Sequence, residues 1–472
     1  MRDHTETRGL IRIKPYTVKT FVITMALLTL SACSTAPYKA PEIAATPAAW
    51  HSDPGPDSSI TADGLTAVAD SRLNELITEA LENNHDLAAR RAEVTVARQQ
   101  LVISGAPRIP ELSASLSGGQ RKLQGTPSST ATTIELSLDL DWELDIWGKL
   151  KDTQKQAALT LAAREAELAG ARLDLIAAVS NAWYDILEAQ RLLKLYEDRL
   201  HNLSSNLEII ETGYRQGLNP ALDVYLTRNG VEQEAARTTA QQQTVAEAVR
   251  RLQLLLGRYP DGQPLPPQVL PQLRASIPAG LPSELISRRP DLRRRWLELM
   301  AADIGIAIAH KQRFPRLSIT GSVGQSSSEL HNLLDASQGI WTLAGGLLQP
   351  LINAGKLAAR EEETRARLKQ LEQYYLSSVF QAFAEVENRL AQEQALAEQY
   401  RQYQAAEKNA LEAETLSFTQ YQRGLVNYAT VLESQRRAFD AQSAVLSLQR
   451  QRLHNRVALY IALGGDYKGE TP

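Results

Sequence analysis

Few side chains in this sequence could act as nucleophiles, general bases or metal ligands. The chain has one cysteine, Cys33, and seven histidines. The histidines are His4, His51, His85, His201, His310, His331 and His454. They show no metal-ligand spacing, no nucleophile motif accompanies them, and the sequence has no glycine-rich phosphate loop. We therefore predict that the chain is not an enzyme, with no catalytic residues, no metal site and no cofactor.

Cys33 is placed for a different chemistry, the acceptance of a lipid. A basic segment and the apolar run from Phe21 to Leu30 lead into Leu30-Ser31-Ala32-Cys33. The run is long enough for a signal peptide and too short to span a bilayer. The pattern resembles a bacterial lipobox, which implies removal of residues 1–32 and attachment of diacylglycerol and a fatty acyl chain to Cys33. Ser34 stands where an aspartate would favour the inner membrane, so the outer membrane is expected. The alternative is a buried free thiol.

Removal of residues 1–32 changes the charge only slightly. It leaves 46 basic against 52 acidic residues, a net charge of −6. A mildly acidic chain gives no reason to expect nucleic-acid binding. The following segment is rich in Pro, Ala, Ser and Asp and buries too little apolar surface to fold. We therefore predict that residues 33–65 are the lipidated N-terminus and a flexible tether.

The rest of the chain is predicted to be a tandem duplication. The stretch from Tyr214 to Leu218, Y-R-Q-G-L, returns 207 residues later as Y-Q-R-G-L, from Tyr421 to Leu425. Between the halves lies a proline-rich segment that can form neither a helix nor a central strand. The predicted domains are repeat 1 at 66–256, the connector at 257–281, repeat 2 at 282–465 and a tail at 466–472.

Each repeat is predicted to contain two strands. They are expected at residues 111–122 and 132–145, and again at 316–327 and 338–349. The alternation is clearest from Ile134 to Leu144, where every second side chain is apolar. The polar positions between them are Glu135, Ser137, Asp139, Asp141 and Glu143. Such strands suit a tilted membrane crossing, whereas the alternative is a water-facing sheet. Four strands cannot close a barrel, since the smallest have about eight, so a membrane-crossing chain must oligomerise.

Long helices are predicted on either side of the strands. One helix precedes each strand pair, at residues 70–104 and 282–312, and a much longer one follows it. The run from Lys356 to Arg423 has no Gly or Pro, and at about 1.5 Å per residue it reaches roughly 100 Å. Heptad spacing of leucines indicates a coiled coil. Gly217 and Gly424 are expected at hairpin tips, where glycine can adopt the left-handed conformation that ends a helix.

Three motifs together resemble the outer-membrane efflux protein family. They are L-P-S-E-L-I-S-R-R-P-D-L from Leu281 to Leu292, W-E-L-D-I-W-G-K from Trp142 to Lys149, and the paired Y-x-x-G-L tips. The chain is similar to the TolC-like, NodT-type lipoproteins of tripartite multidrug pumps. The resemblance implies an α+β outer-membrane protein. It would be a homotrimer whose twelve-stranded β-barrel, with four strands from each chain, continues into a periplasmic α-helical coiled-coil barrel.

The same resemblance implies a role and a set of site residues. The chain is expected to be the outer-membrane channel of an efflux pump, with a periplasmic adaptor, an inner-membrane pump of the resistance-nodulation-division type and outer-membrane lipid as partners. The tips that meet the adaptor would be Gly217, Leu218, Gly424 and Leu425. The periplasmic gate would contain Glu433, Asp223, Arg228 and Tyr421. The competing interpretation is a trimeric coiled-coil lipoprotein, structural or adhesin-like, without a pore.

Overall fold

The computed structural model describes residues 49–52, 70–123, 129–266, 268–273, 282–333 and 339–465. The predicted signal peptide, Cys33 and the tail at 466–472 lie outside the described residues. The chain divides into two compact units. Among the described residues, 99–159 and 299–371 belong to a unit that contains the strands, and the others belong to a helical unit.

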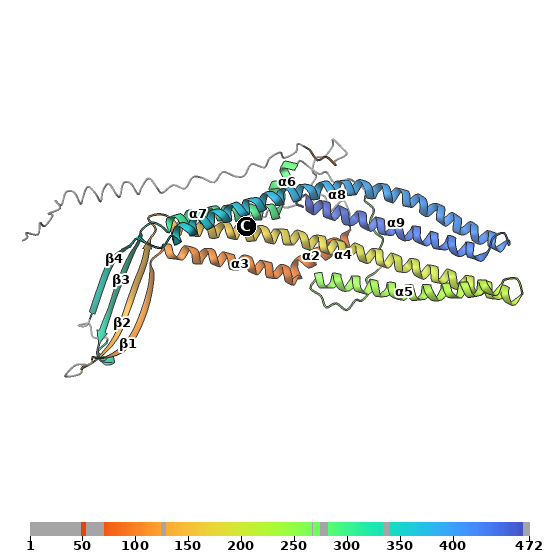
Figure 1. Ribbon diagram of the computed structural model, residues 1–472. Helices are drawn as coiled ribbons and strands as arrows, with labels where there is room; N and C mark the ends of the chain where they lie inside the picture. Colours follow the sequence, from red (N-terminus) through yellow and green to blue (C-terminus); the bar gives the residue numbers. More distant parts are fainter. Residues whose placement is uncertain are drawn as a thin grey trace, which may run out of the picture. The chain divides into compact units, whose positions relative to one another are not determined.

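The first unit contains a four-stranded antiparallel sheet (Figure 1). Its strands are β1 (Glu111–Leu123), β2 (Ser129–Leu144), β3 (Arg316–Ser327) and β4 (Gly339–Leu348). They follow one another in the order β1-β2-β3-β4, so β1 and β4 are the edges of the sheet. Strands from the two halves of the sequence therefore pair with each other, β2 with β3.

The strand register separates an apolar face from a polar face. Leu138 lies between Ala114 on β1 and Val323 on β3. On the opposite face the Ser137 hydroxyl donates to Asp139 at 2.7 Å. This alternation follows from the two-residue period of a strand, which points successive side chains to opposite faces. Leu138 and Val323 are exposed in the single chain, so no described residue covers this part of the apolar face.

Eight α-helices and two 3-10 turns account for most of the other described residues. The shorter helices are α2 (Ser71–Asn83), α3 (His85–Gly105), α6 (Pro282–Arg288) and α7 (Pro290–Lys311). The longer helices are α4 (Lys149–Arg215), α5 (Ala221–Leu255), α8 (Lys356–Gln422) and α9 (Tyr428–Ala462). The 3-10 turns are η1 (Ala106–Arg108) and η2 (Leu330–Asn332).

The long helices form two hairpins of equal dimensions. Helices α4 and α8 have 67 residues each, and α5 and α9 have 35 each. Figure 1 shows α5 running back along α4, and α9 along α8. Helices of this length are stabilised by packing rather than by propensity alone. None of the helices in the described part of the chain combines the length and the hydropathy that a bilayer crossing requires.

Two helices predicted as continuous are broken in the structure. The first ends at Asn84, whose side chain accepts from Leu87 N at 2.9 Å and donates to Leu255 O at 2.9 Å. Asn84 thus ends α2, caps α3 and ties both to α5. The second helix breaks at Arg289, because Pro290 lacks an amide hydrogen and disfavours helical backbone in the residue before it. Helical periodicity continues across both breaks, which is why it did not reveal them.

One part of the predicted flexible tether is packed, so the structure corrects that prediction. Trp50 is buried and contacts Phe383, with ring centroids 6.0 Å apart. The backbone amides of His51 and Ser52 donate to the two carboxylate oxygens of Glu387, at 2.7 and 2.9 Å. A tryptophan buries enough apolar surface to hold a short segment against a helix even where its neighbours are Pro, Ala and Ser.

Arg289 joins three helices at the break before α7. Its guanidinium donates two bonds of 3.0 Å to Asp291, one of 2.7 Å to Glu385 on α8 and one of 3.2 Å to the carbonyl of Ala462 at the end of α9. Arginine suits this place because its planar fork carries five donors. The R-R-P-D motif is therefore a structural junction in this chain.

We expect Arg289→Met to destabilise the helical unit by roughly 2 kcal/mol, because it leaves two carboxylates and a helix-terminal carbonyl without their donor. The measurement is the midpoint of thermal unfolding followed by circular dichroism. The matched control is Arg293→Met, one turn later in α7, where the side chain is exposed. Equal midpoints for the two variants would show that the junction does not contribute to stability.

Candidate functional site

Each hairpin reverses through a glycine in the left-handed conformation. Gly217 has φ +76° and Gly424 has φ +72°. At the first tip Leu218 N donates to Gly213 O at 2.8 Å and Gly217 N to Tyr214 O at 2.9 Å. Matching bonds occur at the second tip, from Leu425 N and Gly424 N. This pair of bonds is the Schellman motif, which satisfies the last carbonyls of a helix and requires a residue that tolerates positive φ.

The two tips differ in how an asparagine closes them. At the first tip the Asn219 side chain folds back and donates to Ile210 O of α4 at 3.2 Å. Gly213 leaves the space for it, because a Cβ there would lie 2.3 Å from Asn219 Nδ2. At the second tip Asn427 instead caps the next helix, its Oδ1 accepting from Thr430 N at 3.0 Å. Asn219 therefore bonds to the helix before its tip, and Asn427 bonds to the helix after its tip.

Large apolar side chains are exposed at both tips. Leu218 and Leu425 each follow the tip glycine and are among the exposed apolar residues of the chain, as are Leu222 and Tyr225 on the first turns of α5. Beneath them, a small core joins the two hairpins. It contains Ile210, Val224, Tyr428 and Val431, all buried. The tips are thus apolar outside and held together by an apolar cluster inside.

Asp223 and Tyr421, both predicted as gate residues, come together across the two hairpins. The Tyr421 hydroxyl donates to Asp223 Oδ2 at 3.3 Å, and the ring of Tyr421 lies 5.2 Å from that of Tyr428. Burial, and then the negative charge of Asp223, raise the pKa of Tyr421 to about 12. The phenol therefore stays protonated at neutral pH and serves as a hydrogen-bond donor between α8 and α5.

Arg228 does not join this pair. Its Nη2 donates to Glu211 Oε1 at 2.6 Å, which connects α5 to α4 within the first hairpin. The Arg228 side chain is largely exposed, and exposed ion pairs typically contribute little to stability. Sequence reasoning named Arg228 but missed Glu211, whose role depends on how the two helices face each other.

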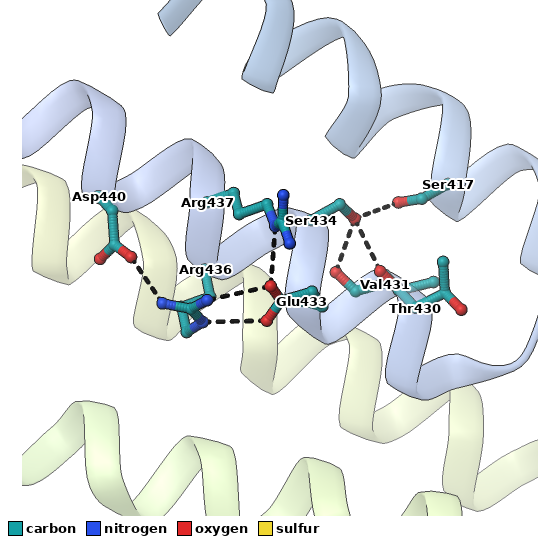
Figure 2. A network of polar contacts seen from close by, with 8 residues as sticks. All are labelled: Ser417, Thr430, Val431, Glu433, Ser434, Arg436, Arg437 and Asp440. Carbon is teal, nitrogen blue, oxygen red and sulfur yellow. Dashed lines mark hydrogen bonds and ion pairs between the residues drawn. The ribbon is translucent and has the colours of Figure 1, made fainter. Parts of the chain in front are cut away.

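Glu433 lies in a network of charges on its own helix (Figure 2). Arg436 binds its carboxylate through two bonds of 3.0 Å, and Arg437 adds one of 2.8 Å. Arg436 also donates to Asp440 at 2.9 Å. These hydrogen bonds, from Arg436 first and then Arg437, lower the pKa of Glu433 to about 2. The sequence analysis named Glu433 without its partners, and the structure supplies them in Arg436 and Arg437. Their i+3 and i+4 spacing was a readable signal.

A second polar centre, absent from the predicted site, links the hairpins through Arg199 of α4. Its Nε lies 3.2 Å from Glu234 Oε2 of α5, and its guanidinium lies 4.7 Å from the ring centroid of Phe439 on α9. Glu234 is buried, and burial raises its pKa. Glutamate and arginine residues on long helices normally face solvent, so the sequence alone gave no reason to expect this pair at a helix packing surface.

A family model described as outer membrane efflux protein matches residues 76–258 and 281–465. The pyoverdine export outer membrane protein OpmQ of Pseudomonas putida is 30% identical over 466 residues, which cover 94% of this chain and 97% of that protein. The cation efflux system protein CusC of Escherichia coli (strain K12) is 31% identical over 419 residues, or 87% and 90% of the two chains.

Solved structures have the same fold. A crystal structure of CusC superposes with a TM-score of 0.81 at 28% identity and covers 91% of this chain and 99% of that chain. A crystal structure of a membrane protein from Pseudomonas aeruginosa gives a TM-score of 0.82 at 30% identity, with coverage of 92% and 100%.

The arginines around Glu433 predict a specific pH dependence. Because its pKa is lowered, the stabilisation from these pairs is complete above the ordinary value of 4.5 and is lost only as the pH falls toward about 2. We expect the difference in thermal midpoint between wild type and Glu433→Gln to stay constant between about pH 7 and pH 5 and to vanish near about pH 2. Glu412→Gln, at an exposed glutamate of α8, is the control. A difference that already disappears at about pH 5 would contradict the described pairing.

Proposed function

Because the chain belongs to the outer membrane efflux protein family, we propose that it forms the passive exit duct of a tripartite efflux pump. It is an outer-membrane component of an efflux system, with a large periplasmic portion. Its family consists of transport channels rather than enzymes. The duct would carry small toxic compounds to the exterior, driven by the pump and not by any reaction in this chain.

The observation that carries the proposal is a sheet that is incomplete in one chain. Edge strands β1 and β4 each have a single neighbour among the described strands, and no described element covers the apolar face, whose leucines are exposed. An open edge with an exposed apolar face is unfavourable in water, and in lipid an unpaired edge is worse, because no water satisfies its backbone. Three copies would supply twelve strands, enough to close a barrel with an aqueous lumen. We therefore propose a homotrimer with a twelve-stranded barrel that continues into a helical barrel.

The partners and the anchor follow from the same proposal. The relatives are outer-membrane components of efflux systems, which implies that an adaptor and a pump work with them. For this chain we propose a periplasmic adaptor and an inner-membrane pump of the resistance-nodulation-division type. The exposed leucines Leu218 and Leu425, held beside Gly217 and Gly424, would be the adaptor-contacting residues, since apolar side chains at rigid turns suit a helical partner. Cys33 would carry the lipid that ties each chain to the outer membrane. The equal lengths of the paired long helices support the proposed duplication.

Purified full-length protein in planar lipid bilayers tests the duct. We expect discrete conductance steps from a species whose mass, by native mass spectrometry, is three chains. Native mass spectrometry must also find no stable monomer in detergent, because the open sheet edges disfavour one. A trimer that never conducts would support the competing interpretation, a structural or adhesin-like lipoprotein without a pore.

The proposed gate consists of four residues close to the tips, and they contribute in different ways. Asp223 and Tyr421 would latch the two hairpins, while Arg228 and Glu433 would order the charges near the opening. We expect Asp223→Asn, Tyr421→Phe, Arg228→Ala and Glu433→Ala each to raise the resting conductance several-fold, with the largest effect at the Asp223 and Tyr421 pair because it bridges hairpins. Single-channel recording at fixed salt gives the measurement.

Glu232→Ala is the matched control for these gate variants. Glu232 is an exposed glutamate of α5 on the turn after Arg228. Its loss should leave the closed-state conductance at the wild-type level. A gate variant that behaves like Glu232→Ala would remove its residue from the gate.

A further inference from the structure

The edges of the sheet are more exposed than its centre. On central strand β2, Leu136 and Leu138 are 37% and 47% exposed, whereas on edge strand β1 Leu112 and Leu116 are each 66% exposed. On edge strand β4, Leu347 is 68% exposed. The leucines of the edge strands are more exposed because each edge strand lacks the second neighbouring strand that covers part of the leucines on β2.

Two edge segments beyond the strands are exposed further still. Leu351 and Ile352, just after β4, are 88% and 96% exposed, and Ile109, just before β1, is 70% exposed. In a four-stranded antiparallel sheet the first strand begins at the end where the fourth finishes. Ile109 and the pair Leu351 and Ile352 therefore lie at the same end of the sheet, on opposite edges.

Both segments are held in place by the chain itself. Trp142 Nε1 donates to Arg108 O at 3.3 Å, and Ile109 N donates to Ala106 O at 3.0 Å. On the other edge, Gln349 Nε2 donates to Arg313 O at 3.1 Å. Two successive residues with positive φ, Ala354 at +50° and Gly355 at +80°, then turn the chain into α8. A left-handed alanine is unfavourable, so the surrounding structure imposes this turn.

The backbone of the second segment argues for a protein partner rather than lipid. Residues 349–353 are neither helix nor strand, and within the described residues no backbone carbonyl accepts a hydrogen bond from the amides of Leu351 and Ile352. Lipid could cover their side chains but could not bond these amides, and water could bond the amides but would leave the side chains uncovered, whereas an adjacent protein edge could do both. The partner must present apolar side chains and free backbone groups along one extended edge.

The strand register allows the opposite edge of the same chain type to meet these needs. Apolar side chains occupy even-numbered positions on β1, such as Leu112, and odd-numbered positions on β4, such as Leu347. When β1 of one copy pairs with β4 of the next, the apolar faces of the two copies lie on the same side only if even-numbered positions of β1 stand opposite odd-numbered positions of β4. A slip of one residue would turn one of these faces to the other side. A register that places Ile109 opposite Ile352 meets this rule.

We propose that Ile109 of one copy packs against Leu351 and Ile352 of the next copy, forming an apolar clasp at the strand–helix junction of each subunit seam. The inference rests on the proposed trimer and adds the residues that close it. The rigid turn at Ala354 and Gly355 positions the two apolar side chains before the subunits meet. The clasp joins different surfaces of neighbouring copies, so it recurs around a closed ring.

Cysteine cross-linking of the full-length protein in membranes tests the clasp. Within one chain, positions 109 and 352 are three strand spacings apart, about 14 Å, which is too far for a disulfide. In Ile109→Cys with Ile352→Cys, oxidation should therefore give covalent dimers and trimers on a non-reducing gel, and reduction should remove them. Each single variant should give none. The control pair is Ile109→Cys with Ile340→Cys, because Ile340 lies at the far end of the same strand β4 and is also exposed.

Each result decides between the alternatives. Absence of cross-links in a trimer that still conducts would overturn the clasp and leave the proposed duct standing. Loss of both the trimer and conductance in wild type would overturn the proposed function itself. Ile352→Trp provides a second readout: we expect its fluorescence to be insensitive to brominated phospholipid. Strong quenching would assign this side chain to lipid and would also overturn the clasp.

Discussion

The structure depends on the packing that covers its longest helices, because these helices would not be stable alone. A helix of 67 residues without packing would expose its apolar stripe along its whole length, and helical propensity is too weak to compensate. In the helical unit, α2, α5 and α9 bury side chains of α4 such as Trp183 and Ile186. Trp50, α6 and α9 do the same for α8 around Val379 and Val386. The polar junctions at Asn84 and Arg289 are the places where one covering helix stops and the next begins.

The polar contacts near the tips are of two kinds, those within one hairpin and those between the two hairpins. Glu433 and Arg228 have their partners within one hairpin, so these pairs order a single hairpin and persist when the hairpins separate. The Asp223 and Tyr421 bond crosses between hairpins, and it breaks when they part. The second kind therefore contributes directly to the balance between two arrangements of the hairpins, whereas the first kind affects that balance only by ordering the hairpin that carries the charges.

Much of this arrangement could be predicted from sequence, because its elements follow local patterns. Alternation between Ile134 and Leu144 indicated a strand, and Gly217 and Gly424 indicated turns, since each signal lies within the segment it describes. The partners of the gate residues were harder. Arg436 and Arg437 were readable from their spacing to Glu433, whereas Glu211 opposite Arg228 required knowledge of how two helices face each other. Trp50 was hidden by the composition around it, because one large side chain does not change the average of a polar segment.

The asparagines at the tips have a consequence for symmetry. Asn219 closes the first tip onto the helix before it, and Asn427 closes the second onto the helix after it, so the two tips of one chain are not equivalent surfaces. A ring of three such chains would present six tips of two alternating kinds, and its symmetry would be threefold rather than sixfold. A partner that distinguishes the two kinds would then bind in three copies. A partner that reads only the shared glycine and leucine would bind in six.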